Sequence, residues 1–539
     1  MGKNRERRES LVYHAKPRPG KIEVVPTKKY NSQRDLAIAY SPGVAIPCQE
    51  IEKDPSTVYK YTNKSNLVAV ISNGTAVLGL GDIGPAASKP VMEGKALLFK
   101  IFADIDVFDI EINEKDPDKF IDVVKSISTT FGGINLEDIK APEAFKIERE
   151  LVDQLDIPVM HDDQHGTAII SAAALLNALE LVNKNIKDVK IVVSGAGAAA
   201  IACTKLYISF GAQLKNIFMT DSKGVINKSR EGLSKEKKYF ATSKQIDTLE
   251  QAMIDSDVFI GLSMANIVSE KMLKTMSRDP IVFAMANPDP EISYDKAMSV
   301  RDDIIFATGR SDLPNQVNNV LGFPFIFRGA LDVRATKINE EMKKAAVIAL
   351  AELAKKPVPE QVNIAYDETK LNFGKDYIIP KPFDPRLISE IPPAVAKAAI
   401  DSGVAQEPIT DWDKYTQILD ERLGNNQKLI RIIHRRARKA KEKKLVFTEA
   451  DHLDVLKAAQ ICFEEKIAEP ILLGRKKIIE ELMESLDFNE NLQIIDPTDK
   501  ANKELIEEYS KILFKKLKRK GKSLDDVKRL LRGRDYFGS

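Results

Sequence analysis

The sequence predicts an α/β protein in three parts: an α/β domain, a Rossmann-like doubly wound parallel sheet, and a partial C-terminal α/β domain. Three observations support this fold class. The 539 residues are too many for one hydrophobic core, because domains average about 150 residues. Short apolar runs alternate with helical segments, as in proteins with parallel sheets. With 43% hydrophobic and 30% charged residues, the composition is that of globular proteins.

The elements can be expected in chain order from these apolar runs. Residues 1–165 contain short runs bounded by Gly, Pro or Asn, at 67–72, 75–80 and 97–110, which predict strands alternating with helices. An Ala- and Leu-rich helix is expected over 167–181. The doubly wound sheet follows, with strands expected at 190–195, 216–221, 258–263, 281–288 and 304–309. Five prolines between 380 and 393 predict an irregular stretch before a short helix at 394–400.

The C-terminal part predicts the opening of a further α/β unit. Strands are expected at 444–449 and 470–474. Residues 428–444 carry nine Lys or Arg against one Glu, which predicts a solvated helix at a domain boundary; a nucleic-acid patch is the alternative. The unit stops abruptly over 525–539, so we expect it to be incomplete. The domain boundaries are predicted at 1–165, 166–410 and 428–539, with a linker at 411–427.

Charge and cysteine content narrow the functional classes. A net charge of +2 singles out neither nucleic acid nor an acidic membrane as a partner. No apolar run reaches the roughly 18 residues of a membrane span, and the basic start MGKNRERRES lacks the apolar stretch of a secretory signal. Cys48, Cys203 and Cys462 lie far apart and suit a reduced compartment. We expect a cytoplasmic protein with no nucleic-acid or membrane partner.

Two glycine-rich segments compete for a dinucleotide. Residues 79–84 fit GxGxxG, but Pro85, Ser88 and Pro90 follow and oppose an immediate helix. Residues 195–200 fit the GxGxxA variant, in which Gly195, Gly197, Ala198 and Ala200 form the turn and the start of an apolar helix. We therefore predict the dinucleotide site at 195–200, and leave a structural turn and a ligand contact as equal alternatives at 79–84.

The acid expected at the ribose is Asp221, which ends the next predicted strand 26 residues after Gly195. Such an acid suits the free 2′-hydroxyl of NAD. Lys223 and Lys228 follow closely and could pair with the 2′-phosphate of NADP, or simply lie in a solvated loop. The spacing leaves the choice of coenzyme open.

Carboxylates cluster at Glu137-Asp138 and at Asp162-Asp163. The second pair lies at the start of the long predicted helix, and such oxygen ligands favour Mg²⁺ or Mn²⁺ over zinc. His161 and His165 are four residues apart, as in the HExxH zinc motif. However, Asp162 replaces the glutamate, and Gly166 and Pro158 oppose a mid-helix position. Helix entry or hydrogen bonding is the plainer interpretation of both histidines.

Five segments, in order and spacing, resemble the bacterial malic enzymes. They are DLAIAYSPGVAIPC (35–48), GLGDIG with PVMEGKALLFK (79–100), NLEDIKAPEAF (135–145), HDDQHGTA (161–168) and TGRSDLPNQVNNVLGFPFIFRGALD (308–332). From about residue 428 the chain is similar to the start of a phosphate acetyltransferase-like domain, as in the long hybrid malic enzymes. This resemblance implies a substrate and metal domain followed by an NAD(P)-binding domain.

The resemblance also implies a reaction and roles for residues. The reaction is oxidative decarboxylation of L-malate to pyruvate and CO₂, usually with NADP, with oxaloacetate decarboxylation as a further activity. Lys95 matches the general base, which needs a pKa lowered by burial or neighbouring cations. Asp162 matches the acid that assists the base, and Tyr40 the acid that protonates C3. The remaining matches are the metal ligands Glu137, Asp138 and Asp163, and the substrate or nicotinamide amides Asn287, Asn319 and, more weakly, Asn318.

Two departures limit these expectations. Ala76 stands where larger family members carry an arginine, so another group must bind the malate carboxylate. Residues 449–455 lack the Gly-containing pattern of acetyltransferases, so we expect the C-terminal part to be a regulatory or assembly module with an acyl-CoA effector. The family also implies a homodimer or larger homo-oligomer. A nucleotide-binding protein without turnover is the alternative for the core.

Overall fold

The computed structural model describes residues 2–77, 79–287, 289–366, 371–422, 443–464, 467–486, 488 and 490–539. The chain divides into two compact units, Met1–Leu423 and Gly424–Ser539. The basic helix expected at 428–444 falls mainly on residues 423–442, outside the described ranges. Among the described helices, none has the length and apolarity needed to cross a membrane.

The first sheet of the N-terminal unit has four parallel strands in the order β2-β1-β3-β4. The strands are β1 (Leu67–Ser72), β2 (Asp106–Glu111), β3 (Gly133–Leu136) and β4 (Val159–His161). The helices between them are α5 (Pro85–Ala103), α6 (Pro117–Ile127) and α7 (Glu143–Gln154). Because β3 and β4 are parallel neighbours, the acidic residues that follow them emerge at the same edge of the sheet.

The second sheet has six strands in the order β10-β9-β8-β5-β6-β7, all parallel except the short β7. They are β5 (Ile191–Ser194), β6 (Ile217–Asp221), β7 (Gly224–Val225), β8 (Val258–Gly261), β9 (Ile281–Ala284) and β10 (Ile305–Thr308). The helices around it are α9 (Ala198–Ser209), α10 (Lys235–Tyr239), α11 (Leu249–Met253), α12 (Glu270–Thr275) and α13 (Tyr294–Val300). The strand order reverses between β5 and β8, and such a switch point opens a ligand crevice. The predicted doubly wound sheet is therefore confirmed.

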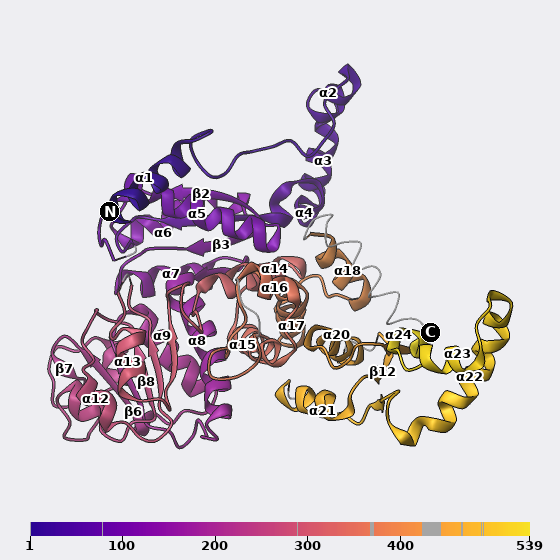
Figure 1. The fold of residues 1–539 in the computed structure, drawn as a ribbon. Coiled ribbons are helices and arrows are strands. Elements are labelled where there is room, and N and C mark those ends of the chain that lie inside the picture. The colour runs from indigo at the N-terminus through magenta and orange to yellow at the C-terminus, as the bar shows by residue number, and fades with distance from the viewer. Residues whose placement is uncertain are drawn as a thin grey trace. The chain divides into compact units, whose positions relative to one another are not determined.

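A layer of helices connects the two sheets. It contains α8 (Asp162–Leu181), α14 (Phe323–Asp332), α15 (Glu340–Lys355), α16 (Glu360–Ala365), α17 (Leu387–Asp401) and α18 (Trp412–Arg422). One apolar core joins residues of α5 and β1 to α8, α9, α15 and α17, so both sheets share it. In Figure 1, α8 and α9 run beside each other at the second sheet, and α8 leads back to the first.

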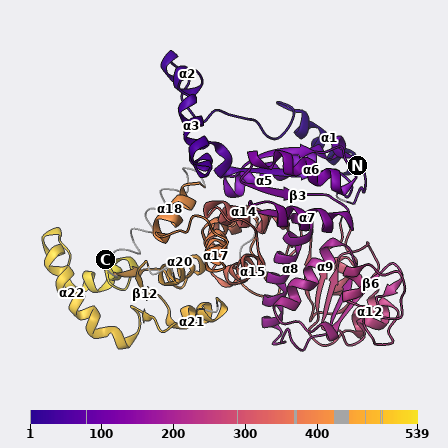
Figure 2. The same cartoon turned by 180° about the vertical axis from the view of Figure 1, so that it is seen from behind.

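An arm leaves the N-terminal unit before β1. We call residues 24–53 the N-terminal arm; it contains α2 (Gln33–Ala39) and α3 (Ala45–Lys53). It follows α1 (Gly2–Ala15) and precedes α4 (Val58–Tyr61). Figures 1 and 2 both show α2 at the far end of this arm, away from the first sheet. Neither α2 nor α3 contains a buried residue.

Three sequence expectations about local structure are wrong. Helix α5 begins at Pro85 directly after Gly84, because proline at the first helical position has no N–H to lose. Likewise α17 runs through Pro392 and Pro393, which lie in its first two turns. The run 75–80 forms no strand among its described residues, since Val77 only bridges to Gly81 across a turn.

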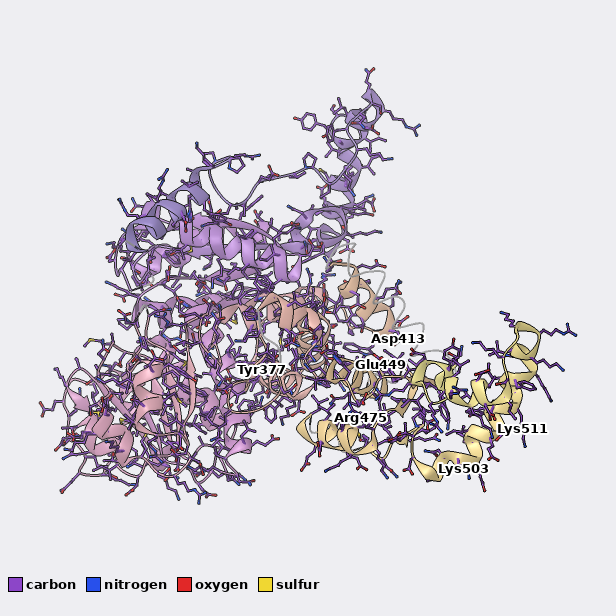
Figure 3. The ribbon with its side chains drawn as sticks, in the orientation of Figure 1. Tyr377, Asp413, Glu449, Arg475, Lys503 and Lys511 are labelled. Carbon is purple, nitrogen blue, oxygen red and sulfur yellow. The ribbon has the colours of Figure 1, made fainter. Side chains whose placement is uncertain are left out.

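The C-terminal unit is a small parallel α/β sheet in the order β11-β12-β13. Its strands are β11 (Lys444–Phe447), β12 (Glu469–Leu473) and β13 (Gln493–Ile495). Its helices are α20 (Leu453–Glu464), α21 (Lys476–Ser485), α22 (Lys503–Leu517), α23 (Leu524–Leu530) and α24 (Arg534–Gly538). Asp451 accepts hydrogen bonds from Arg475 at 2.9 Å and Arg534 at 2.7 Å, which ties α24 to the turn before α21. Figure 3 labels Arg475 in this unit, with Lys503 and Lys511 on α22.

Candidate active site

One lysine and four acids occupy the carboxyl edge of the first sheet. Glu137 and Asp138 directly follow β3. Asp162 and Asp163 form the first turn of α8, immediately after β4. Lys95 reaches them from the buried face of α5. Three segments far apart in sequence, at α5, after β3 and at the start of α8, thus bring together five of the residues singled out from the sequence.

Lys95 contacts two of these acids directly. Its Nζ lies 2.6 Å from Oδ2 of Asp162 and 2.9 Å from Oε1 of Glu137. Its ammonium also lies 4.2 Å from the centroid of the Phe323 ring, a cation–π contact. Only 9% of Lys95 is exposed. The lysine is therefore held in one orientation, between the acids and an aromatic wall.

Burial and charge oppose each other in this cluster. Burial alone would lower the pKa of Lys95, but the carboxylates of Asp162 and Glu137 outweigh it and raise that pKa. This differs from the lowered pKa expected for a base, because the neighbours are acids rather than cations. Burial raises the pKa of Glu137 and of Asp162, while Lys95 opposes both shifts. The cluster therefore has more acidic groups than its one lysine can balance.

Glu137, Asp138 and Asp163 fit a divalent metal. One carboxylate oxygen from each lies within 4.8 Å of the others. The backbone N–H of Asp138 donates to Oδ2 of Asp163 at 2.8 Å, and the Asn135 amide donates to Oε2 of Glu137 at 2.8 Å. These bonds orient two of the three carboxylates, as outer partners of metal ligands do. An all-oxygen donor set of this kind suits Mg²⁺ or Mn²⁺.

The two histidines of HDDQH do not form a zinc site with each other. His161 is fully buried as the residue that caps α8. The Nε2 of His165 lies 3.0 Å from a carboxylate oxygen of Glu148, whose other contact is the His161 backbone N–H at 2.8 Å. Of the plainer interpretations, helix entry describes His161, whose ring nitrogens have no hydrogen-bond partner among the described residues, and hydrogen bonding describes His165.

The three asparagines predicted to contact substrate or nicotinamide occupy different positions. Asn319 joins the cluster: its Nδ2 donates to Oδ2 of Asp162 at 3.2 Å, and its Oδ1 accepts from Thr167 at 3.0 Å. The side chain of Asn318 instead caps the turn that follows, by accepting the N–H of Val320. Asn287 is exposed beyond the carboxyl end of β9, at the edge of the second sheet where the glycine turn lies.

Tyr40 is not brought to the cluster within its own chain. It ends α2 on the N-terminal arm, and 78% of it is exposed. In both ribbon views α2 is well separated from α5 and α8, which carry Lys95 and Asp162 (Figures 1 and 2). Its assignment as the acid at C3 stays a prediction.

The glycine turn after β5 has the form expected of a dinucleotide site. Gly195 has a φ of +115°, and a Cβ there would meet the backbone oxygen of Leu262 at 2.4 Å. A Cβ on Gly197 would meet nothing within 4 Å, so the start of α9 is open to a ligand. Ala198 is the first residue of α9, and Ala200 is buried against the core. This turn lies at the switch point between β5 and β8.

Asp221 ends β6 beside that turn and is paired with two cations. Its Oδ2 lies 2.9 Å from Nη2 of Arg230 and 3.0 Å from Nζ of Lys237. Partial burial would raise its pKa, but these two cations and the backbone N–H of Lys223 hold the pKa well below its usual range. The contact that Lys223 makes with Asp221 is a hydrogen bond donated by its backbone N–H.

Sequence reasoning missed several residues that support the site. Arg230 and Lys237 lie nine and sixteen residues after Asp221, in a loop and in the short helix α10, and neither belongs to a motif. Glu291 is fully buried and binds the N–H groups of Ser263 and Ala286, which fixes the loops after β8 and β9. Burial raises the pKa of Glu291. Asn135 is the first residue of the segment 135–145, which resembles a malic enzyme motif. Its position two residues before Glu137 is the feature from which its contact with Glu137 could have been predicted.

Comparisons with known proteins agree with this geometry. Residues 19–152 match the family described as malic enzyme, N-terminal domain, and residues 164–367 match malic enzyme, NAD binding domain. Residues 428–539 match the phosphate acetyl/butaryl transferase family. The crystal structure of malic enzyme from Pyrococcus horikoshii superimposes with a TM-score of 0.72 at 39% identity, covering 80% of this chain and 99% of that one.

Two curated relatives differ in their coenzyme. The NADP-dependent malic enzyme of Escherichia coli is 54% identical over 532 residues, which cover 97% of this chain and 69% of that protein. The NAD-dependent malic enzyme of Rhizobium meliloti is 53% identical over 473 residues, covering 88% of this chain and 61% of that protein. From its matched domains, its fold and these relatives, the chain belongs to the malic enzyme family.

Proposed function

We propose that this chain converts L-malate to pyruvate and CO₂ with NADP as hydride acceptor and Mg²⁺ or Mn²⁺ as metal. The observation that carries this proposal is the buried Lys95, held by Asp162 and Glu137 beside three clustered carboxylates. Oxaloacetate decarboxylation needs the same groups and is proposed as a further activity. The cytoplasmic location expected from the sequence remains a prediction.

Proton transfer is assigned to Lys95 and Asp162. Asp162, which Asn319 holds in position, first accepts a proton from the Lys95 ammonium across their 2.6 Å contact. The neutral Lys95 then takes the proton of the malate C2 hydroxyl while the C2 hydrogen leaves as hydride to NADP. The C3–C4 bond then breaks to release CO₂, and Tyr40 donates a proton to C3. Asn287 and, more weakly, Asn318 are proposed to contact substrate or nicotinamide.

The metal fits Glu137, Asp138 and Asp163. When bound, it supplies positive charge that stabilises negative charge developing on the C2 oxygen. The chain's own contribution is to hold the three carboxylates within 4.8 Å of one another, on two adjacent strand ends. Burial of Glu137 without a full set of counter-charges favours a cation at this position.

For the coenzyme, the charges at Asp221 favour NADP. A carboxylate alone would select the free 2′-hydroxyl of NAD and repel a phosphate. Here Arg230 and Lys237 already neutralise Asp221, and together they exceed it by one positive charge. Arg230 is further fixed by bonds to the backbone oxygens of Gly224 and Val225. The chain therefore offers a preformed cationic surface to a 2′-phosphate.

We assign a regulatory or assembly role to the C-terminal unit, with an acyl-CoA as the effector. Its acetyltransferase-like match supports an acyl-CoA ligand. The end of α22 and the 3₁₀ helix Lys518–Lys520 after it are basic and exposed, and would attract the phosphates of such a ligand; the cations are Lys515, Lys516, Lys518, Arg519 and Lys520. Titrating the full chain with acetyl-CoA, with free CoA as control, tests this role through the rate of malate oxidation.

The test of the main proposal is a rate comparison on the full chain. Initial rates are measured with L-malate, Mg²⁺ or Mn²⁺, and NADP or NAD. We expect metal-dependent formation of NADPH and pyruvate in equal amounts, with NADP the better acceptor. Nucleotide binding without turnover under any of these conditions would instead show a nucleotide-binding protein.

A further inference from the structure

We propose that Glu291 is a positioning residue for hydride transfer: its buried carboxylate holds the loops after β8 and β9 in the arrangement that aligns the nicotinamide ring with malate. This inference rests on the proposed function, which supplies the hydride transfer. It deepens that function by assigning a role to a residue outside both the acidic cluster and the ion pairs at Asp221. Glu291 acts through the two loops, without contact with the reacting atoms.

The carboxylate of Glu291 accepts one backbone N–H from each loop. Its Oε1 accepts the N–H of Ser263 at 2.9 Å, and its Oε2 accepts the N–H of Ala286 at 3.1 Å. Both partners are donors, and an ionised carboxylate offers two acceptor oxygens and no donor. Glutamine has the same shape but only one oxygen. It would therefore satisfy one of the two loops and leave the other N–H facing a donor.

The position of Glu291 is an unusual one for a carboxylate. The residue is fully buried, and its hydrogen bonds come from the two loops, with no charged partner among the described residues. Burying a carboxylate without a cation opposes folding unless hydrogen bonds compensate for it. An apolar side chain would fill the same space at a lower cost. The connection between the two loops is therefore what the carboxylate adds here.

Residue 261 must be glycine for this carboxylate to fit. Gly261 is the last residue of β8, and a Cβ there would lie 2.3 Å from Cδ of Glu291 and 2.5 Å from its Oε2. Cβ atoms do not approach other atoms so closely, so alanine at this position would push the carboxylate away from the N–H groups. Gly261→Ala thus offers a second way to break the same connection without removing the charge.

The loop after β8 packs against the dinucleotide turn. A Cβ on Gly195 would lie 2.4 Å from the backbone oxygen of Leu262 and 3.5 Å from Cβ of Ser263. The hydroxyl of Ser263 also lies 3.0 Å from that of Ser194, at the end of β5. Because Glu291 binds the N–H of this same Ser263, its carboxylate fixes the wall of the turn that is proposed to bind the coenzyme.

The loop after β9 carries the amide proposed to contact substrate or nicotinamide. Ala286, whose N–H binds Glu291, directly precedes Asn287. Strands β8 and β9 are parallel neighbours, so both loops leave the same edge of the second sheet. Glu291 therefore connects the dinucleotide turn to Asn287. A displacement of about 1 Å between reacting groups lowers a rate by about 10², so this connection bears directly on hydride transfer.

Kinetics of Glu291→Gln test the proposal. The adenosine end of the coenzyme is proposed to bind at Asp221, away from these loops, so we expect the KM for NADP to stay near the wild-type value. We expect kcat to fall about tenfold or more, with a larger primary isotope effect on kcat for malate deuterated at C2. Glu270→Gln is the matched control, because Glu270 is exposed at the start of α12. An unchanged kcat, or a lower kcat with a smaller isotope effect, would overturn the proposal.

The variant is expected to fold, because other bonds also join the two loops. The N–H of Asn266 donates to the oxygen of Pro290, and the N–H of Val268 donates to that of Glu291, both at 3.1 Å. Neither bond needs the carboxylate. If Glu291→Gln nevertheless fails to fold by circular dichroism, Gly261→Ala is measured in its place. The same fall in kcat is expected, and wild-type kinetics in folded Gly261→Ala would overturn the proposal.

A measurement without turnover separates this inference from the proposed function. The fluorescence of bound NADPH comes from its reduced nicotinamide ring, and it is measured in the absence of malate. We expect Glu291→Gln to bind NADPH with wild-type affinity but with lower fluorescence anisotropy, since the ring is held less firmly. Wild-type anisotropy in the variant would overturn the role of Glu291, whereas the absence of malate oxidation in the wild-type protein would refute the proposed function alone.

Discussion

Two carboxylate sites in the N-terminal unit have opposite charge balances. At the edge of the first sheet, four acids surround one lysine. At the end of β6, two cations surround the single acid Asp221. Partly buried charges that remain unbalanced favour a ligand of the opposite sign. The first site is therefore suited to a divalent cation, and the second to a phosphate.

The largest effect is expected from removing the one cation of the acidic site. Lys95→Ala should lower malate-dependent NADPH formation by about 10² to 10⁴, the range for loss of a positioned acid–base group. The assay is the initial rate at saturating malate and metal. Lys89→Ala is the matched control, since Lys89 lies on the same helix and 47% of its side chain is exposed.

The fold of Lys95→Ala must be checked, because four acids would then lack their lysine. Circular dichroism and the thermal midpoint should show a folded protein, and Lys95→Arg should keep the charge without restoring the rate. A folded Lys95→Ala protein with normal turnover would remove Lys95 from the mechanism.

The next-largest effect is expected at the acidic site, which is proposed to bind the divalent metal ion. Asp163→Asn keeps an oxygen for the N–H of Asp138 but removes one ligand charge. We expect at least about a tenfold rise in the Mn²⁺ concentration needed for half-maximal binding, measured by calorimetry without substrate. Asp122→Asn on the exposed side of α6 is the control. Unchanged Mn²⁺ affinity would place the metal elsewhere.

The sequence predicted the acidic site better than the basic one, for a physical reason. Glu137, Asp138 and Asp163 lie directly after parallel strands, and adjacent strand ends meet whatever the loops do. Asp221 was predicted from its position at the end of the next strand, 26 residues after Gly195. Arg230 and Lys237 were missed because they reach Asp221 through a loop and a short helix, whose path no periodicity encodes.

Local geometry was the weaker part of the sequence prediction. Pro85 and Pro90 suggested that no helix follows Gly84, yet α5 starts there and positions Lys95. Proline at the first helical position costs little, so Pro85 could not decide, and α5 accommodates Pro90 in its interior. The charges beside Lys95 could not be predicted from the sequence: the carboxylates of Asp162 and Glu137 raise its pKa in this structure, whereas a role as base needs a lowered pKa.

A moderate effect is expected at the basic site around Asp221, which is proposed to bind the 2′-phosphate of NADP. Lys237→Gln removes one of the two cations at Asp221. We expect the KM for NADP to rise about tenfold, as for the loss of one charge-assisted bond, with little change for NAD. Lys238→Gln on the same short helix is the control, because its side chain is exposed. Equal changes with both coenzymes would show that Lys237 is not near the 2′-position.

The smallest effect concerns a third carboxylate whose charge is balanced. Glu148 lies on α7, accepts the His161 backbone N–H and contacts His165 of α8. Burial would raise its pKa, but the two histidines lower it from 4.5 to about 2. A lowered pKa in the folded state contributes stability above pH 4.5, and this contribution is lost as the pH falls towards 2.

Glu148→Gln keeps an acceptor for the N–H but removes the charge. Its thermal midpoint should lie a few degrees below wild type at pH 7 and converge with it towards pH 3, whereas Asp153→Asn, exposed on the same helix, should follow wild type throughout. A constant offset at all pH values would mean that Glu148 acts through packing and not through charge.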